Sequence, residues 1–208
     1  FFVNGEWLVL GRHPDYLGRS RRLIGLVIDR GFGLAAWNPI YLAVPMSLVA
    51  MVKRRVGRWQ LLLALILSGW AVATWVAFTM HGWWWPGRQL VPVLPLVAIA
   101  FAVWLGRAGR RAAAAMAAAG VFAVAGWLWL VTEASTGRIA LIVDFEQTSN
   151  PLYRAWRTVL PDHRHLDSSG VVLTALWAVV LLVGSAMVWR RCSTGGEHED
   201  EDEEASLG

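Results

Sequence analysis

The sequence predicts an all-α membrane protein of about five transmembrane helices, with short interfacial helices in the segments outside the membrane. Two observations predict this class. The 208 residues are 56% hydrophobic and only 16% charged, whereas soluble domains carry about 25% charged residues. Five apolar segments also approach the roughly 20 residues that a helix needs to cross the hydrocarbon core of a bilayer. These segments should be helical, because lipid leaves no backbone polar group unpaired.

The chain divides into three parts. Residues 1–32 are expected on the outer, extracytoplasmic side, with an interfacial helix within residues 19–30. Residues 33–189 form the five-span bundle, which includes an outer loop of residues 132–170. Residues 190–208 are expected to be an acidic, disordered cytoplasmic tail. The predicted spans are residues 33–52, 59–80, 89–106, 112–131 and 171–189.

Basic residues near the span ends predict the orientation. Arginine and lysine crowd three short stretches, residues 53–58, 107–111 and 190–191, and five crossings place all three on one side. Cytoplasmic loops carry such an excess, so the C-terminus is expected in the cytoplasm. Lys53 is the only lysine beside many arginines, a bias typical of GC-rich bacterial genomes. The expected location is the inner (plasma) membrane of a bacterium, as a multi-pass protein.

The first span carries a start signal in its middle. In "AAWNPIYLAVP", Asn38 is a candidate N-cap with Pro39 at the first helical position, and Pro45 is expected to kink the helix. A helix from Pro39 to residue 52 is too short for about 30 Å of hydrocarbon. Irregular backbone before it is tolerated only where it is buried in protein or lines a cavity. The sequence therefore predicts a cavity beside Trp37 and Asn38.

The outer loop carries a similar signal. In "NPLYRAWRTVLPD", Asn150 is a candidate cap with Pro151 at the first helical position. The apolar residues that follow fall on one face, which predicts an interfacial helix lying on the membrane. That face consists of Leu152, Ala155, Trp156, Val159 and Leu160.

Arginine and aromatic residues gather on the side predicted to be outside. The planar guanidinium of arginine matches phosphate, and tryptophan favours the lipid–water interface. Interfacial anchoring is enough to explain any single one of these residues. The outer side normally carries few arginines, however, so their number here favours a lipid ligand that carries phosphate. The candidate donor-phosphate-binding residues are Arg88, Arg30 and Arg22, and the candidate cavity rim is Trp37, Asn38, His81 and Trp85.

Arg88 is the strongest single candidate for a phosphate-binding residue. It stands in "HGWWWPGRQLVPVLPL", residues 81–96, directly before a span that contains Pro92 and Pro95. Prolines in a span free backbone carbonyls and mark broken helices beside cavities. A ligand-facing Arg88 and a snorkelling anchor both remain open, while Trp83–Trp85 are expected to be interfacial anchors.

Motifs of soluble enzymes are absent: there is no glycine-rich phosphate loop, zinc-spaced Cys/His pair or Gly-x-Ser-x-Gly elbow. No metal site, cofactor or nucleic-acid partner is predicted. His163 and His165 leave a divalent metal open, although His-x-His on a polar loop is more often solvated surface. The catalytic residues are unknown from these residues alone.

Three stretches resemble a known family: "RRLIGLVIDRGFGLAAWNPIYLAVP", "WWWPGRQLVPVLPLVAIA" and "NPLYRAWRTVLPDHR". They are similar to the C-terminal half of bacterial multi-spanning membrane glycosyltransferases of the GT-C superfamily, which includes protein mannosyltransferase-like (family 39-like) enzymes. Over residues 21–164 the resemblance implies a polyprenyl-phosphate-linked sugar donor at the outer face, with Arg88 near the donor phosphate. The family's catalytic acid lies in an N-terminal module, so the upstream part of the same protein is an expected partner.

Three functions therefore compete. The chain is expected to be the C-terminal fragment of a membrane glycosyltransferase, an enzyme only if the upstream part carries the catalytic acid. A transporter or flippase of a lipid-linked or anionic substrate is the first alternative, and a non-catalytic scaffold subunit is the second. Transport predicts ionisable residues deep within the spans, and these spans contain almost none.

Overall fold

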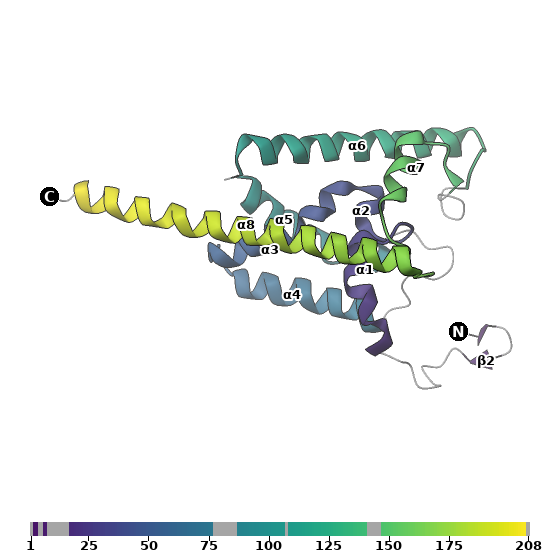
Figure 1. Cartoon of the computed structure of the whole chain (residues 1–208), viewed down its shortest axis with the longest axis horizontal. Helices are drawn as coiled ribbons and strands as arrows, with labels where there is room; N and C mark the ends of the chain where they lie inside the picture. The colour runs from purple at the N-terminus through teal and green to yellow at the C-terminus, as the bar shows by residue number, and fades with distance from the viewer. Residues whose placement is uncertain are drawn as a thin grey trace.

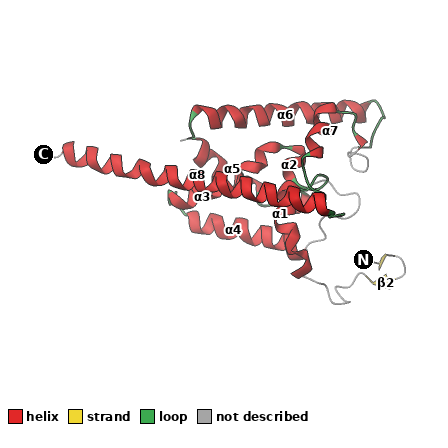
Figure 2. Ribbon diagram, in the orientation of Figure 1, coloured by secondary structure: helices red, strands yellow, loops and turns green. Residues whose placement is uncertain are grey.

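The computed structural model describes residues 2–3, 6–7, 17–76, 87–106, 108–140 and 147–206, with side chains for residues 18–76, 87–106, 108–140 and 147–193. In this part of the chain the regular structure is helical, apart from two short antiparallel strands (Figure 2). The strands are β1 (Phe2–Val3) and β2 (Glu6–Trp7). The helices are η1 (Leu17–Arg21), α1 (Arg22–Ile28), α2 (Leu34–Trp37), η2 (Pro39–Ala43), α3 (Val44–Lys53), α4 (Trp59–Ala71), η3 (Val72–Val76), η4 (Arg88–Leu90), α5 (Leu94–Leu105), α6 (Arg110–Ser135), α7 (Pro151–Thr158) and α8 (Ser168–Ser206).

Within the described residues, three helices are long and apolar enough to cross a membrane. They are Trp59–Val76, which joins α4 to η3, then α6, and Ser168–Ser193 within α8. All three extend along the long axis of the molecule, whereas α1 lies across one end of α4 and α8 (Figure 1). Their apolar side chains point outward, with Leu182 70% and Val121 69% exposed. Such surfaces suit contact with lipid, and the three candidate spans indicate a multi-pass membrane protein.

The first predicted span is interrupted, as the sequence suggested, at Asn38. This residue has extended backbone (φ −142°, ψ 97°), and its Oδ1 accepts the Ile40 N–H at 3.2 Å. The predicted cap with Pro39 at the first position is confirmed. The kink predicted at Pro45 is wrong, because Pro45 lies in the first turn of α3, where its missing N–H breaks no helical hydrogen bond.

The third predicted span is shorter than expected. Residues 91–93 form turns after η4, and α5 begins at Leu94 with Pro95 in its first turn. A proline here is tolerated, whereas one further into the helix would remove a hydrogen bond. With η2 and α3, which span Pro39–Lys53, α5 is one of two shorter apolar helices beside the three long ones. α3 packs against both α5 and α8.

The predicted helix of the outer loop is present as α7. Asn150 Oδ1 accepts the N–H groups of Leu152 and Tyr153 at 3.0 and 3.2 Å, which confirms the cap. The buried face differs in part from the predicted one: Leu160 is buried as predicted, but Leu152 is 58% exposed, and Tyr153 is buried although it was not on the predicted face. The reason is tertiary, since the Tyr153 ring stacks on the Trp37 ring with centroids 4.0 Å apart.

The end of the chain also differs from its prediction. The backbone of α8 remains helical to Ser206, through most of the segment expected to be disordered. Glutamate and alanine have good helix propensity. Extending an existing helix orders only one residue for each hydrogen bond gained, whereas starting a new helix orders several. Figure 1 shows α8 extending beyond the other helices toward the C-terminus.

A buried core lies where α1 and α2 meet the long helices, and we call this region the α1–α2 end. Leu26, Ile28, Ile66 and Leu90 are almost fully buried there. Within a bilayer such packing stabilises the fold through van der Waals contact rather than through removal of the side chains from water. The Trp70 Nε1–H donates to the Leu23 carbonyl at 3.1 Å, which holds α1 across α4.

Candidate functional site

Gly87 is packed directly against α2. A Cβ atom at this position would lie 2.2 Å from Leu34 Cδ2, and Gly87 has a left-handed backbone with φ +74°. Both facts favour glycine, which has no Cβ atom and adopts positive φ without strain. The contact fixes the start of η4, and therefore the backbone of Arg88, against α2.

A cleft adjoins this contact, and we call it the Asn38 cleft. Its walls are mainly apolar, with the amide of Asn38 and the phenol of Tyr41 as its polar side chains. The lining residues are Leu34, Trp37, Asn38, Tyr41, Gly87, Val91 and Leu94. A cleft with apolar walls and few polar groups is typical of a site for an amphipathic small molecule.

Arg88 is the first residue of η4 and follows Gly87, which lines the cleft. Its side chain is exposed. An exposed guanidinium beside a cleft can reach an anionic group of a ligand seated there. Its ligand role stays a prediction.

The other two predicted phosphate-binding residues have different neighbours. The Arg30 N–H donates to the Pro161 carbonyl at 2.9 Å. The Gly170 N–H, the Ser169 hydroxyl and, more weakly, the charge of Arg30 lower the pKa of Asp167, which places Arg30 near the start of α8.

Arg22 lies at the start of α1, beside Arg19 and Arg21. Burial, followed by repulsion from Arg19 and Arg21, lowers the pKa of Arg22. Arg19 Nη1 donates to the Trp75 carbonyl at 2.7 Å, so this arginine cluster packs against η3. A shared phosphate among Arg88, Arg30 and Arg22 stays a prediction.

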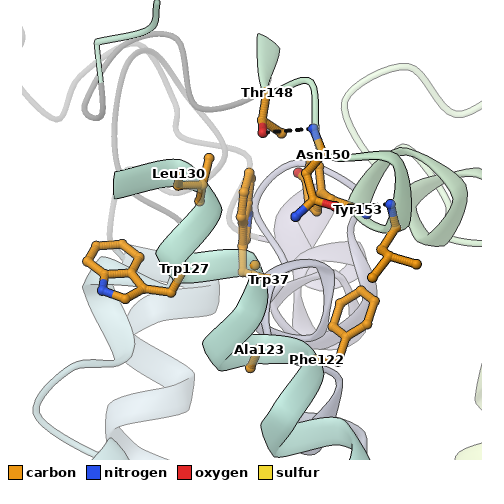
Figure 3. Close-up of a pocket in the computed structure, with 10 residues that line it drawn as sticks. Trp37, Phe122, Ala123, Trp127, Leu130, Thr148, Asn150 and Tyr153 are labelled. Carbon is orange, nitrogen blue, oxygen red and sulfur yellow. Dashed lines mark hydrogen bonds between the residues drawn. The ribbon is translucent and has the colours of Figure 1, made fainter. Parts of the chain in front are cut away.

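Trp37 separates the Asn38 cleft from a second hollow, the α6–α7 cavity. Figure 3 shows Trp37 between Leu130 of α6 and the segment of Thr148 and Asn150. This cavity has a volume of about 40 Å³, which is room for a few water molecules but not for a sugar ring. The Trp37 Nε1–H donates to the Gly31 carbonyl at 3.1 Å. The indole is therefore held on one side by the turn after α1 and on the other by Tyr153.

A buried carboxylate organises that turn. Asp29 Oδ1 accepts the N–H groups of Gly31 and Phe32 at 2.9 and 2.7 Å. Its Oδ2 accepts the backbone N–H of His163 at 2.8 Å. Both side chains are 1% exposed, so a substrate cannot reach Asp29 in this arrangement, and its role is to position the turn that holds Trp37.

Burial by itself raises the pKa of Asp29, but hydrogen bonds from His163, Phe32 and Gly31 outweigh it. The pKa therefore lies below its ordinary value. Asp29 is ionised at neutral pH, which it must be to accept all of these hydrogen bonds.

A second buried carboxylate anchors α7. Glu133, near the end of α6, accepts the Thr148 hydroxyl at 2.6 Å and the Ser149 N–H at 2.8 Å. The Ser149 hydroxyl also donates to it. Thr148 in turn accepts the Asn150 N–H at 3.2 Å, the bond drawn in Figure 3. Glu133 thereby fixes the N-cap of α7 and the wall of the α6–α7 cavity.

Two predicted rim residues, His81 and Trp85, lie outside the described residues. Trp37 and Asn38 both line the Asn38 cleft. His163 is buried against Asp29, whereas the side chain of His165 is 81% exposed. Across the described ranges, no three His, Cys, Asp or Glu side chains gather as a metal site.

Sequence reasoning missed most wall residues of this region, among them Leu34, Tyr41 and Tyr153. Leucine and tyrosine in apolar helices carry no local signal that separates a cleft wall from a core position. The Pro-Gly pair before Arg88 was a signal for a turn, but it did not reveal what Gly87 touches.

No family model, no curated protein and no solved structure matches the chain. The resemblance to GT-C enzymes stays a prediction from the sequence.

Proposed function

We propose that this chain is the C-terminal part of a multi-pass membrane glycosyltransferase and holds a polyprenyl-phosphate-linked sugar donor at the outer membrane face. The donor phosphate lies beside Arg88, and the adjoining part of the donor enters the Asn38 cleft. The observation that carries this proposal is the packing of Gly87 on Leu34, which fixes an exposed arginine next to a cleft with polar groups.

The topology in this proposal has five crossings. The two shorter helical segments, Pro39–Lys53 and Leu94–Leu105, complete their crossings through α2, η4 and the adjoining irregular backbone. Lys53 Nζ lies 4.7 Å from the centre of the Trp189 ring, and Arg54 Nε donates to Cys192 Sγ at 3.4 Å. Two of the basic stretches assigned to the cytoplasm therefore meet, which supports placing them on one side.

The chemistry divides between two parts of the protein. Transfer of a sugar from a lipid phosphate needs a carboxylate that activates the acceptor and a cation that stabilises the departing phosphate. Arg88 supplies the cation, since guanidinium and phosphate form short charge-assisted hydrogen bonds. Asp29 and Glu133 are buried in structural networks, and the resemblance to GT-C enzymes assigns the acceptor base to the upstream part of the protein.

The test is binding of polyprenyl phosphate to the chain purified in nanodiscs. We expect Arg88→Ala to weaken binding by about ten- to a hundredfold, the equivalent of one lost charge-assisted contact. Arg111→Ala is the matched control, because Arg111 is exposed at the start of α6, on the side assigned to the cytoplasm. Unchanged affinity in a correctly folded Arg88→Ala protein contradicts the proposal.

A second measurement separates the enzyme from the flippase. The upstream part and this chain, assembled in vesicles that contain a labelled lipid-linked sugar, should consume the donor and release free polyprenyl phosphate. Movement of intact donor across the bilayer without its consumption would instead identify a transporter.

A further inference from the structure

A groove lies between α1, α3, α4 and α8, and every side chain that lines it is apolar. The polar atom of its one tryptophan, Trp70 Nε1, is occupied by the Leu23 carbonyl. The lining residues are Leu23, Ile24, Val27, Val44, Pro45, Leu48, Ile66, Leu67, Trp70 and Leu181. We call it the apolar groove. It shares no lining residue with the Asn38 cleft.

The apolar groove opens onto the surface of the candidate spans. Leu23 and Leu67, on two of its walls, are 48% and 53% exposed. The exposed leucines lie on α1 and on the Trp59–Val76 span. A ligand therefore enters from the bilayer, and hydrocarbon is the chemistry that such walls accept.

Cations lie at one end of the apolar groove. Arg19, Arg21 and Arg22 directly precede Leu23, the first groove residue of α1. Arg19 is fixed by its bond to the Trp75 carbonyl. Arg22 is partly buried, and repulsion from its two neighbours adds to that burial in lowering its pKa. A bound anion would relieve this repulsion.

We propose that the apolar groove and the Arg19–Arg21–Arg22 cluster together bind one anionic phospholipid of the surrounding bilayer. One acyl chain occupies the groove, and the phosphate lies at Arg21 and Arg22. A phospholipid carries both chemistries in the required order, since its glycerol joins the phosphate to the acyl chains. It is also the most concentrated such molecule around a membrane protein, which favours its binding by mass action.

This site is independent of the proposed donor site, because the cation, the cavity and the walls all differ. The bound lipid would hold α1 across α3, α4 and α8. Since α1 leads into the turn of Asp29, the lipid would stabilise the α1–α2 end as well.

The test is native mass spectrometry of the chain in detergent, titrated with phosphatidylglycerol or with phosphatidylcholine of the same acyl chains. We expect one phosphatidylglycerol to bind in clear preference to phosphatidylcholine. Arg21→Gln with Arg22→Gln should weaken phosphatidylglycerol binding about thirtyfold and abolish the preference. Arg110→Gln with Arg111→Gln, at the opposite end of the molecule, is the matched charge control. Arg19 is left in place because it holds η3.

A second pair of variants tests the groove itself. Ile24→Trp should fill it and exclude the acyl chain, while Val124→Trp, at a position of α6 that is 60% exposed, should have no effect. Equal binding of the two phospholipids overturns the proposal. So does displacement of phosphatidylglycerol by an equal concentration of polyprenyl phosphate, which would assign the groove to the donor. Arg88→Ala should leave phosphatidylglycerol binding unchanged, so failure here and failure of the donor proposal are distinguishable.

Discussion

Asp29 and His163 are 134 residues apart in the chain and form one buried contact. Asp29 Oδ2 accepts the His163 backbone N–H at 2.8 Å and lies 3.5 Å from its Nδ1. On the far side of the ring, His163 Nε2 lies 3.4 Å from the Thr174 hydroxyl. The contact therefore links the turn after α1 to the outer loop and to the first turns of α8, and it supports the turn that holds Trp37.

Asp29→Asn should destabilise the fold by about 2–4 kcal/mol, because the new amide N–H cannot accept the hydrogen bonds that reach Oδ2. The check is the midpoint of thermal unfolding in detergent. Asp162→Asn is the control: Asp162 Oδ1 alone accepts the N–H groups of Arg164 and His165, and an asparagine oxygen can replace it. Equal midpoints for the two variants would show that the buried contact contributes little.

Acid should also weaken the fold through Asp29. Its pKa in the folded protein is below the ordinary value of about 3.9. For a lowered pKa, the stabilisation is present above the ordinary value and is lost as the pH falls through the folded pKa. We expect unfolding free energy to fall below about pH 4, less steeply in Asp29→Asn. Asp167 contributes in the same direction in both proteins, so only the difference between the two curves reports Asp29. Parallel curves would contradict this account.

Gly87→Ala should weaken ligand binding at Arg88. The methyl group would meet Leu34, and alanine at φ +74° costs about 1–2 kcal/mol. The start of η4 must then shift and move Arg88 away from the Asn38 cleft. Gly137→Ala is the matched control, because Gly137 also has positive φ (+70°) but open space around its position. Polyprenyl phosphate affinity should fall only in Gly87→Ala, and an equal loss in both variants would exclude displacement of Arg88 as the cause.

Glu133→Gln should loosen α7. The carboxylate accepts hydrogen bonds from Thr148 and Ser149, and a glutamine amide turned toward either donor leaves it unpaired, at a cost of about 1–3 kcal/mol. Backbone hydrogen exchange should increase in residues 148–158 while remaining unchanged in α4. Unchanged exchange in α7 would show that Tyr153 packing holds the helix without Glu133.

Much of the fold could be predicted from local patterns. The apolar segments identified the long helices, and Asn38 and Asn150 identified two helix starts, because a cap depends on residues only two or three positions away. Errors arose where a local pattern had two readings. Pro45 is compatible with either a kink or the first turn of a helix. Leu152 is compatible with either face of α7, and the stacking of Tyr153 on Trp37 decides which face is buried.

The candidate site was predicted only in part. A cavity beside Trp37 and Asn38 could be predicted because a break in a span is visible in sequence, and both residues line the Asn38 cleft. The ligand role of Arg88, which the prolines after it suggested, stays a prediction. Arg22 and Arg30 were grouped with Arg88 because all three were assigned to the same side of the membrane. Residues on one side of a membrane can still lie far apart and need not form one binding site. Their neighbours in the structure differ.

By itself the sequence determined the class of the protein, an assembly of apolar helices for a membrane, and the positions where several of them start. These properties follow from hydrophobicity and hydrogen bonding over a few neighbouring residues. Only the tertiary structure decided that Asp29 meets His163, that Gly87 rests on Leu34 and that Trp37 stands between two hollows. Such contacts join residues from distant parts of the chain, and their partners are chosen by how the helices pack together.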